Sequence, residues 1–175
     1  MSDRKIVTVF GSGNPLEGEE AYAVAREVGM QLAELGYGVA NGGYGGTMEA
    51  SARGAAEAGG HVVGVTCSVW SSQPNPYIDE VVRTGKLTER IDTLIRLGEG
   101  GYVVLPGATG TLAELAMVWE GMCKHMLPKR PLVCLGFWRP LVEMMIAERP
   151  RSAEYVAVID SPRQFGSYFP PVAGT

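Results

Sequence analysis

Short runs of β-branched and aromatic residues alternate along this chain with longer segments whose apolar positions recur at helical spacing. The short runs predict strands at residues 5–10, 37–41, 62–66, 102–105, 132–135 and, less regularly, 155–159. The longer segments predict helices at residues 19–35, 48–58, 87–97, 112–122 and 140–148. This alternation indicates an α/β fold, with a parallel sheet of about six or seven strands and helices on both faces.

Two segments depart from the alternation. Residues 68–85 include Trp70 and Pro76 and follow neither period, so they are either a functional binding loop or a loop that caps the edge of the sheet. Near the other end, Ser161 followed by Pro162 is typical of a helix N-cap and first helical position, which predicts a short last helix.

Composition and charge narrow the class of protein. The 175 residues, 46% of them hydrophobic, suffice for the core of one domain spanning residues 1–175. The formal net charge is −4 and the charges are scattered, which argues against nucleic acid or a membrane as a partner. The locally basic stretch 124–163 is more typical of solvated helix ends than of a binding face. No apolar run approaches 18 residues and no signal sequence precedes the first strand, so we expect a cytoplasmic protein.

The cysteines and histidines do not follow a metal-binding pattern. Cys67, Cys123 and Cys134 are far apart in apolar surroundings, which indicates reduced thiols rather than disulfides. His61 and His125 are not at metal-ligand spacing from a cysteine or from each other. We therefore expect neither a metal site nor a bound cofactor.

Three glycine-rich turns each follow a predicted strand. Because the carboxyl ends of parallel strands meet at one edge of a sheet, the three turns would lie close together there. Their backbone N–H groups would then form a binding surface for an anionic ligand. The candidate phosphate- or nucleotide-binding residues are Gly11, Ser12, Gly13, Gly42, Gly43, Gly45, Gly46, Thr47, Met48, Pro106, Gly107, Thr109, Gly110 and Thr111.

The same turns disfavour two common nucleotide sites. The first turn begins G-x-G but has Leu16 where a dinucleotide site has its third glycine, and Asn41 and Gly42 stand where the ribose-binding carboxylate would be needed. The P-loop pattern G-x-x-x-x-G-K-[ST] is absent from the sequence. A mononucleotide or a sugar phosphate remains.

Glu114 has two interpretations. Its spacing from Thr111 is that of a capping box, in which the glutamate reaches back to the first residue of the motif. Alternatively it is a catalytic carboxylate, provided that a second polar residue converges on it. Arg90 is the best candidate for that residue: it is either a surface arginine or a side chain that holds the ligand phosphate or orients Glu114.

This combination resembles the LOG (Lonely Guy) family, long labelled "possible lysine decarboxylases". The family hallmark is P-G-G-x-G-T-x-x-E with an upstream E-R pair, and the chain has Glu89-Arg90 and Pro106-Gly107-Ala108-Thr109-Gly110-Thr111-Leu112-Ala113-Glu114. The loop 42–50 is closer to a bacterial branch that includes molybdenum-cofactor carrier proteins than to the plant members. Ala108 departs from the hallmark at its second glycine, and would restrict the turn if that position needed a positive φ.

The resemblance implies a Rossmann-like homodimer and hydrolysis of the N-glycosidic bond of a nucleoside 5′-monophosphate, with Arg90 and Glu114 as the catalytic pair. A non-catalytic nucleotide- or molybdenum-cofactor-binding carrier is the alternative. A lysine decarboxylase is not expected, because the lysines have no context suited to a pyridoxal-phosphate Schiff base.

The stretch 112–126 adds a second reason to expect a homodimer. Met117, Trp119, Met122 and Met126 give it flexible apolar bulk that suits a contact between subunits. The alternative is that these side chains only pack on the sheet.

Overall fold

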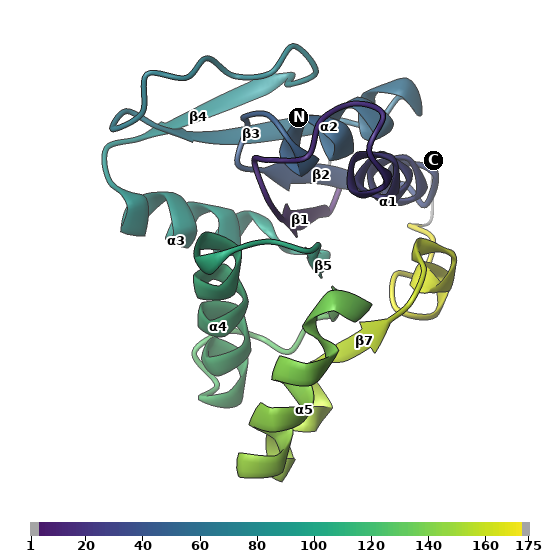
Figure 1. Ribbon diagram of the computed structural model, residues 1–175, viewed down its shortest axis with the longest axis vertical. Helices are drawn as coiled ribbons and strands as arrows, with labels where there is room; N and C mark the ends of the chain where they lie inside the picture. Colours follow the sequence, from purple (N-terminus) through teal and green to yellow (C-terminus); the bar gives the residue numbers. More distant parts are fainter. Residues whose placement is uncertain (1–3, 173–175) are drawn as a thin grey trace.

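The structure, a computed structural model, describes residues 4–172 and contains one seven-stranded sheet (Figure 1). All strand pairs are parallel, in the order β4-β3-β2-β1-β5-β6-β7. The strands are β1 (Ile6–Phe10), β2 (Gly38–Asn41), β3 (Val62–Cys67), β4 (Glu80–Thr84), β5 (Gly101–Val104), β6 (Leu132–Leu135) and β7 (Ala157–Ile159). The predicted α/β fold, Rossmann-like with a parallel sheet, is confirmed.

Helices cover both faces of the sheet. The helices are α1 (Glu20–Glu34), α2 (Thr47–Glu57), α3 (Leu87–Leu97), α4 (Thr109–Cys123) and α5 (Arg139–Glu148), with 3₁₀ turns η1 (Gly136–Trp138), η2 (Pro150–Tyr155) and η3 (Pro162–Ser167). One core cluster joins α1, α2 and η3 to the sheet, and a second joins α3, α4 and α5 to its other face. In β5 and its extension, Val103 and Leu105 belong to the first cluster, whereas Tyr102 and Val104 belong to the second. This alternation is the period-two pattern of a strand buried on both faces.

The strand order reverses beside β1. The chain first adds β2, β3 and β4 on one side of β1, then returns through α3 to place β5 on its other side. Ligands of open parallel sheets bind outside the carboxyl ends of the strands at such a reversal. The turns after β1, β2 and β5 therefore meet at the expected edge.

Two predictions about the elements are wrong in detail. Strand β4 lies within the segment 68–85 that the pattern left irregular; it is an edge strand with mostly exposed side chains, so hydrophobic alternation does not mark it. Helix α4 begins at Thr109, three residues before the predicted start, because the turn residues themselves adopt helical geometry. The short last element is confirmed as a 3₁₀ turn, capped by Ser161 and Gln164.

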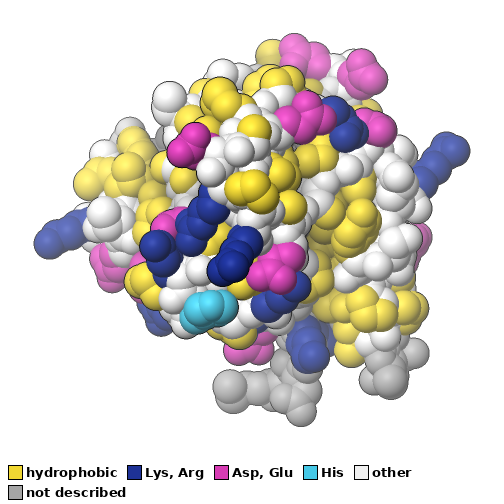
Figure 2. Space-filling view, turned by 90° about the horizontal axis from the view of Figure 1, so that it is seen from below, with side chains coloured by type: hydrophobic (Ala, Val, Ile, Leu, Met, Phe, Trp, Pro, Cys, Tyr) yellow, Lys and Arg dark blue, Asp and Glu magenta, His cyan; other side chains and the backbone are white. Residues whose placement is uncertain are grey.

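The basic stretch near the carboxyl ends of α4 and α5 is balanced by acidic residues. Figure 2 views the molecule from below and shows Lys and Arg side chains interspersed with Asp and Glu. Glu120 pairs with both Lys124 and Arg149, and Lys129 pairs with Glu154. These side chains are about half-exposed, which agrees with the prediction of solvated helix ends. Within residues 4–172 the structure has no helix that is both long and apolar enough to span a membrane.

Helices α1 and α2 approach each other at two glycines. A Cβ at Gly29 of α1 would overlap the carbonyl oxygen of Ser51, and a Cβ at Gly54 of α2 would overlap that of Arg26. Backbone atoms cannot move aside cheaply, so the two glycines fix how closely the helices pack.

We predict that Gly54→Ala destabilises the protein although alanine is the better helix former. Overpacking costs about 1–3 kcal/mol, which outweighs the roughly 1 kcal/mol gained from helix propensity. Urea unfolding of wild type and variant measures the difference. Gly166→Ala is the matched control, because a Cβ there enters open space. Equal stability of Gly54→Ala and wild type would contradict the close packing.

Candidate functional site

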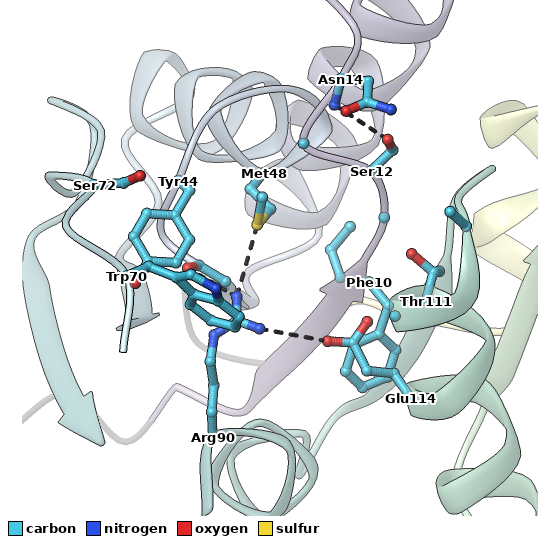
Figure 3. Close-up of a pocket in the computed structure, with 16 residues that line it drawn as sticks. Phe10, Ser12, Asn14, Tyr44, Met48, Trp70, Ser72, Arg90, Thr111 and Glu114 are labelled. Carbon is cyan, nitrogen blue, oxygen red and sulfur yellow. Dashed lines mark hydrogen bonds and ion pairs between the residues drawn. The ribbon is translucent and has the colours of Figure 1, made fainter. Parts of the chain in front are cut away.

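A cleft of about 380 Å³ opens at the carboxyl ends of β1 and β2, beside the start of α4 (Figure 3). It is lined by Val9, Phe10, Gly11, Ser12, Gly13, Asn14, Gly42, Tyr44, Met48, Trp70, Ser72, Arg90, Ala108, Gly110, Thr111 and Glu114. The cleft is therefore built from three turns far apart in the sequence, together with α3 and the segment after β3.

The predicted site residues divide into two groups. Those that line the cleft are Gly11, Ser12, Gly13, Gly42, Met48, Arg90, Gly110, Thr111 and Glu114. Those that do not are Gly43, Gly45, Gly46, Thr47, Pro106, Gly107 and Thr109. Glycine runs mark where a turn lies, but they do not tell which of its residues face the ligand and which only permit the turn.

Asn41, buried at the end of β2, organises the second glycine turn. Its side-chain amide donates to the carbonyl oxygen of Met48 at 2.8 Å and to the Ser51 hydroxyl at 3.1 Å, and its side-chain oxygen accepts from the Gly43 N–H at 2.8 Å. Gly43 and Gly46 have φ values of 76° and 69°, a region that favours glycine. An asparagine in place of a ribose-binding carboxylate thus has a structural role here.

The first turn is fastened to the second. The N–H and the hydroxyl of Thr47 both donate to the carbonyl oxygen of Ser12, at 2.8 and 3.0 Å. A Cβ at Gly11 would overlap the Thr47 hydroxyl, so this position must remain without a side chain. Thr47 therefore does not line the cleft itself but fixes the position of Ser12, which does.

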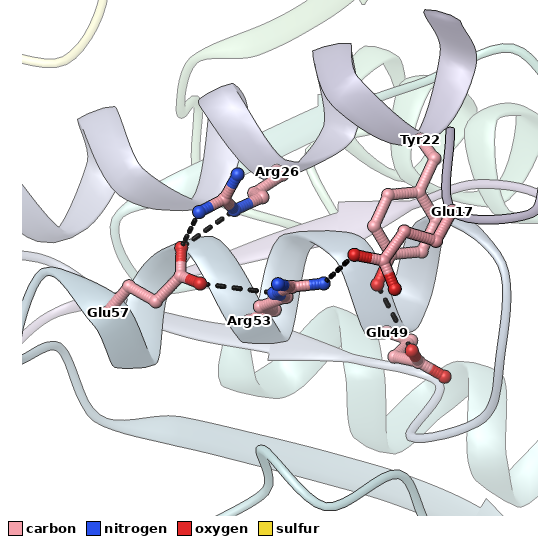
Figure 4. A network of polar contacts seen from close by, with 6 residues as sticks. All are labelled: Glu17, Tyr22, Arg26, Glu49, Arg53 and Glu57. Carbon is pink, nitrogen blue, oxygen red and sulfur yellow. Dashed lines mark hydrogen bonds and ion pairs between the residues drawn. The ribbon is translucent and has the colours of Figure 1, made fainter. Parts of the chain in front are cut away.

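A network of polar side chains secures the loop that follows the first turn (Figure 4). Glu17 of that loop pairs with Arg53 of α2 at 2.6 Å, and Arg53 also pairs with Glu57 at 3.0 Å. Glu57 in turn binds Arg26 of α1 at 2.6 Å. Each exposed pair contributes little by itself, but together they connect the loop to both helices.

The third turn leads directly into α4. Ala108 is the residue before the helix, with φ −98° and ψ −155°, an extended conformation that alanine adopts freely. The departure from the family hallmark at this position therefore has no backbone cost. A Cβ at Gly107 would overlap the Thr111 side chain, whereas a Cβ at Gly110 would meet open space.

The capping-box interpretation of Glu114 is wrong. Because α4 begins at Thr109, Thr111 is the third helical residue and cannot be the N-cap, and no side chain caps the helix. The first-turn N–H groups of Gly110 and Thr111 have no carbonyl partner within the helix, so this end of the cleft can accept an anion. Glu114 follows one turn later on the side of α4 that faces the cleft.

Glu114 is a buried carboxylate, only 7% exposed. Its Oε1 lies 3.9 Å from Nη1 of Arg90. Burial raises the pKa of Glu114 to about 7, since it penalises the charged form by more than the Arg90 charge favours it. A carboxylate that titrates near neutral pH inside a cleft is the pattern found at many functional sites.

Arg90 is also buried, which rules out the surface arginine among the alternatives that the sequence left open. Its Nε donates to the carbonyl oxygen of Val65 at 2.7 Å, and its Nη2 donates to that of Gly42 at 3.0 Å. Burial lowers its pKa, and the charge of Glu114 acts in the opposite direction. Only the Nη1 side of the fork points at Glu114, so this geometry favours orienting the carboxylate over gripping a phosphate (Figure 3).

The two residues of the Glu-Arg pair have different surroundings. The side chain of Glu89 is exposed and accepts a hydrogen bond from the Gly85 N–H at 2.8 Å, at the start of α3. Arg90 is instead buried and lines the cleft. Adjacent positions on a helix point about 100° apart, which is why one is solvated and the other lines the cleft.

Sequence reasoning missed the aromatic wall of the cleft, which consists of Tyr44 and Trp70. The centroids of their rings lie 5.6 Å and 5.3 Å from the Arg90 guanidinium carbon. The Tyr44 hydroxyl accepts from the Cys67 N–H at 2.8 Å and donates to the Cys67 carbonyl oxygen at 3.1 Å. The only available signal was one aromatic residue in the second glycine-rich turn and one in the irregular segment 68–85. The remaining missed residues are Val9, Phe10, Asn14, Ser72 and Ala108.

The segment after β3 is held against the second glycine turn by Asn75. Its backbone N–H donates to the Gly43 carbonyl oxygen at 2.8 Å, and its side-chain amide donates to that of Tyr44 at 3.0 Å. Of the two interpretations left open for this segment, it therefore contributes to the cleft and also ends in the edge strand β4. Among the described residues, no cluster of histidine, cysteine, aspartate and glutamate has a metal-binding arrangement.

We predict that Glu114→Gln stabilises the protein at pH 8 and not at pH 4. The pKa of Glu114 is about 7 in the folded protein against an ordinary value of 4.5, so the folded state binds more protons between these values and wild-type stability falls as pH rises through them. The shift corresponds to on the order of 3 kcal/mol. Urea unfolding at both pH values measures it.

The matched control is Glu143→Gln, at an exposed position of α5, which should leave the pH dependence of stability unchanged. A Glu114→Gln variant whose stability relative to wild type is the same at pH 4 and pH 8 would refute the raised pKa.

Comparisons with known proteins agree with this architecture. The model of the SLOG cluster4 family matches residues 4–162. An uncharacterized protein of Archaeoglobus fulgidus is 32% identical over 154 residues, covering 84% of this chain and 90% of that protein. The pyrimidine/purine nucleotide 5′-monophosphate nucleosidase of Escherichia coli is 31% identical over 108 residues, which is 55% of this chain and 23% of the nucleosidase. The chain thus spans about a quarter of that enzyme.

Solved structures show the same fold over nearly the whole chain. The molybdenum cofactor carrier protein of Chlamydomonas reinhardtii superposes with a TM-score of 0.74 at 26% identity, covering 91% of this chain and 92% of that one. The molybdenum cofactor binding protein of Rippkaea orientalis gives 0.76 at 22% identity, with 93% of each chain covered, a likeness of fold. With the family model matched over 4–162, the chain belongs to the SLOG cluster4 family, within the wider LOG-like superfamily.

Proposed function

We propose that the chain is a nucleoside 5′-monophosphate phosphoribohydrolase of LOG type, which releases a free base and ribose 5-phosphate from AMP-like nucleotides. The observation that carries the proposal is Glu114, a buried carboxylate with a pKa near neutrality, one helical turn beyond an anion-accepting helix start. The partial similarity to a nucleotide 5′-monophosphate nucleosidase supports the same reaction class.

The substrate phosphate would bind where the first turn meets the start of α4. Ser12 and Gly13 lie on one side and the free N–H groups of Gly110 and Thr111 on the other. Backbone N–H groups and the positive end of the helix dipole favour an anion there. Because Glu114 lies one turn further along α4, a ribose attached to that phosphate would lie beside its carboxylate.

The ionised carboxylate would then act on the glycosidic bond. As the bond between the base and C1′ lengthens, positive charge develops on the ribose, and a nearby carboxylate stabilises it. Glu114 also orients a water molecule and accepts its proton as the water oxygen bonds to C1′, while the base leaves with the bonding electron pair and takes up a proton from solvent. Arg90 acts as a positioning residue, because its backbone hydrogen bonds fix the one nitrogen that faces Glu114.

A lysine decarboxylase has no support in this site. That chemistry requires a lysine to form a Schiff base with pyridoxal phosphate. The described residues that line the cleft include no lysine.

A non-catalytic carrier is the second candidate function. It is favoured by the likeness to the Chlamydomonas molybdenum cofactor carrier protein, which extends over nine-tenths of both chains at 26% identity. The same helix start could hold the phosphate of a nucleotide or of a phosphorylated cofactor. The two candidates differ in whether the ligand is recovered unchanged.

We predict that the protein releases free base from AMP or another nucleoside monophosphate, measured by chromatography. Glu114→Gln should reduce the rate roughly 100-fold or more, the range typical of losing a positioned proton-transfer group. The wild-type rate should rise with pH through about 7, because the ionised form of Glu114 is the catalytically active one.

Arg90→Met is the informative companion variant, since it keeps bulk between Tyr44 and Trp70 while removing the charge. It should move the pH midpoint of any remaining activity upward, because the Arg90 charge lowers the pKa of Glu114. Absence of base release from every monophosphate at high enzyme concentration would overturn the hydrolase. Saturable binding with intact ligand recovered would then support the carrier.

We further propose that the protein is a homodimer, with a second copy covering the apolar groove of about 540 Å³ between α4 and α5. The stretch 112–126 divides as both interpretations anticipated: Trp119 and Met122 are buried, whereas Met117 is 48% exposed and Met126 79% exposed. Met145, which lines the groove, is 40% exposed, and an exposed methionine in an apolar groove suits a contact with another copy.

Light scattering at micromolar concentration should give the mass of a dimer, and Met145→Glu, which places a charge in the groove, should shift it toward the monomer. The matched control is Met144→Glu, the neighbouring exposed methionine of α5 that does not line the groove, which should affect the mass less. A wild-type mass of one chain would refute the dimer.

A further inference from the structure

Trp70 differs from the other two tryptophans in the chain. Trp119 and Trp138 are 6% and 4% exposed, and their indole N–H groups donate to backbone carbonyl oxygens at 3.0 and 2.9 Å. Trp70 is 42% exposed and lines the cleft, and its indole N–H donates to no acceptor within residues 4–172. Aromatic side chains in the lining of a cleft are a common feature of small-molecule binding sites.

The position of Trp70 is fixed by polar and aromatic neighbours. Its ring meets the Tyr44 ring edge to face, with centroids 5.8 Å apart and planes at 89°. The Arg90 guanidinium lies 5.3 Å from its centroid. Tyr44 is itself held by two hydrogen bonds to the backbone of Cys67. The wall is therefore preorganised and would lose little freedom on binding a ligand.

The wall faces the groups assigned to the ribose and phosphate. In Figure 3, Trp70 and Tyr44 lie on one side of the cleft, Glu114 and Thr111 lie on the opposite side, and Ser12 lies at a third corner. A ligand whose phosphate is at the start of α4 and whose ribose is beside Glu114 would extend its base toward the indole.

We infer that Trp70 forms the base subsite by stacking on the nucleobase, and that this contact supplies the affinity for a nucleotide over a ribose phosphate without a base. The inference rests on the proposed nucleotide ligand. Stacking tolerates any base because every base has a π-face, and it favours purines because their two rings overlap more of the indole. The alternative role is only to cover Arg90, a role that any bulky apolar side chain could fill.

Calorimetric titration with AMP and with ribose 5-phosphate separates these roles. All variants carry Glu114→Gln, so that AMP is not consumed. Trp70→Leu should weaken AMP binding roughly 10-fold or more, the scale of losing one base stack, and change ribose 5-phosphate binding less than about twofold. Trp70→Phe keeps an aromatic face and should bind AMP within about threefold of the parent.

Phe137→Leu is the matched control, since Phe137 is exposed but does not line the cleft. Equal weakening of AMP and ribose 5-phosphate by Trp70→Leu, or no weakening of either, overturns the base subsite. If the parent binds neither ligand, both the nucleotide site and this inference fail. If AMP binds with the expected variant pattern but wild type does not hydrolyse it, the hydrolase fails and the base subsite stands.

Discussion

The site depends on one buried ion pair. Nη1 of Arg90 lies 3.9 Å from Oε1 of Glu114, and each residue is only 7% exposed. The pair lies at the point where the strand order reverses. Removing two charges from water is costly, and their attraction offsets this only where further hydrogen bonds complete the environment. Here the carbonyl oxygens of Val65 and Gly42 supply those bonds to Arg90, whereas Glu114 is left with little compensation.

The need to accommodate that pair explains several features of the surrounding sequence. A Cβ at Gly42 would overlap the Arg90 guanidinium, so the second turn must begin with glycine at this point. Asn41 then holds the rest of the turn through the hydrogen bonds of its side-chain amide. Thr47, at the end of that turn, donates a hydrogen bond to the Ser12 carbonyl oxygen and so fixes the first turn relative to the second. The glycines permit the close approach of backbone to side chain, and the polar residues behind them keep the cleft open in one shape.

Much of the fold and part of the candidate site could be predicted from the sequence. Buried parallel strands are continuous apolar runs, so six of the seven were found, while β4 was missed because an edge strand such as Glu80–Thr84 has mostly exposed side chains. The convergence of three turns followed from parallel topology alone. The surroundings of Arg90 stayed open between surface and site, because helical periodicity cannot tell whether an arginine is solvated or meets buried partners such as the carbonyl oxygens of Val65 and Gly42. Trp70 and Tyr44 were missed because the contacts that orient them join segments 26 residues apart, which no local pattern encodes.

The central claim is that burial keeps Glu114 partly protonated near neutral pH while Arg90 holds its orientation. Carbon NMR of the side-chain carboxyl groups, with Glu114 assigned by comparison with Glu114→Gln, follows this ionisation directly. A titration midpoint near 7 is the predicted result. A midpoint near the ordinary glutamate value of 4.5 would contradict the account, because Glu114 would then be an ordinary ionised partner of Arg90 without a raised pKa.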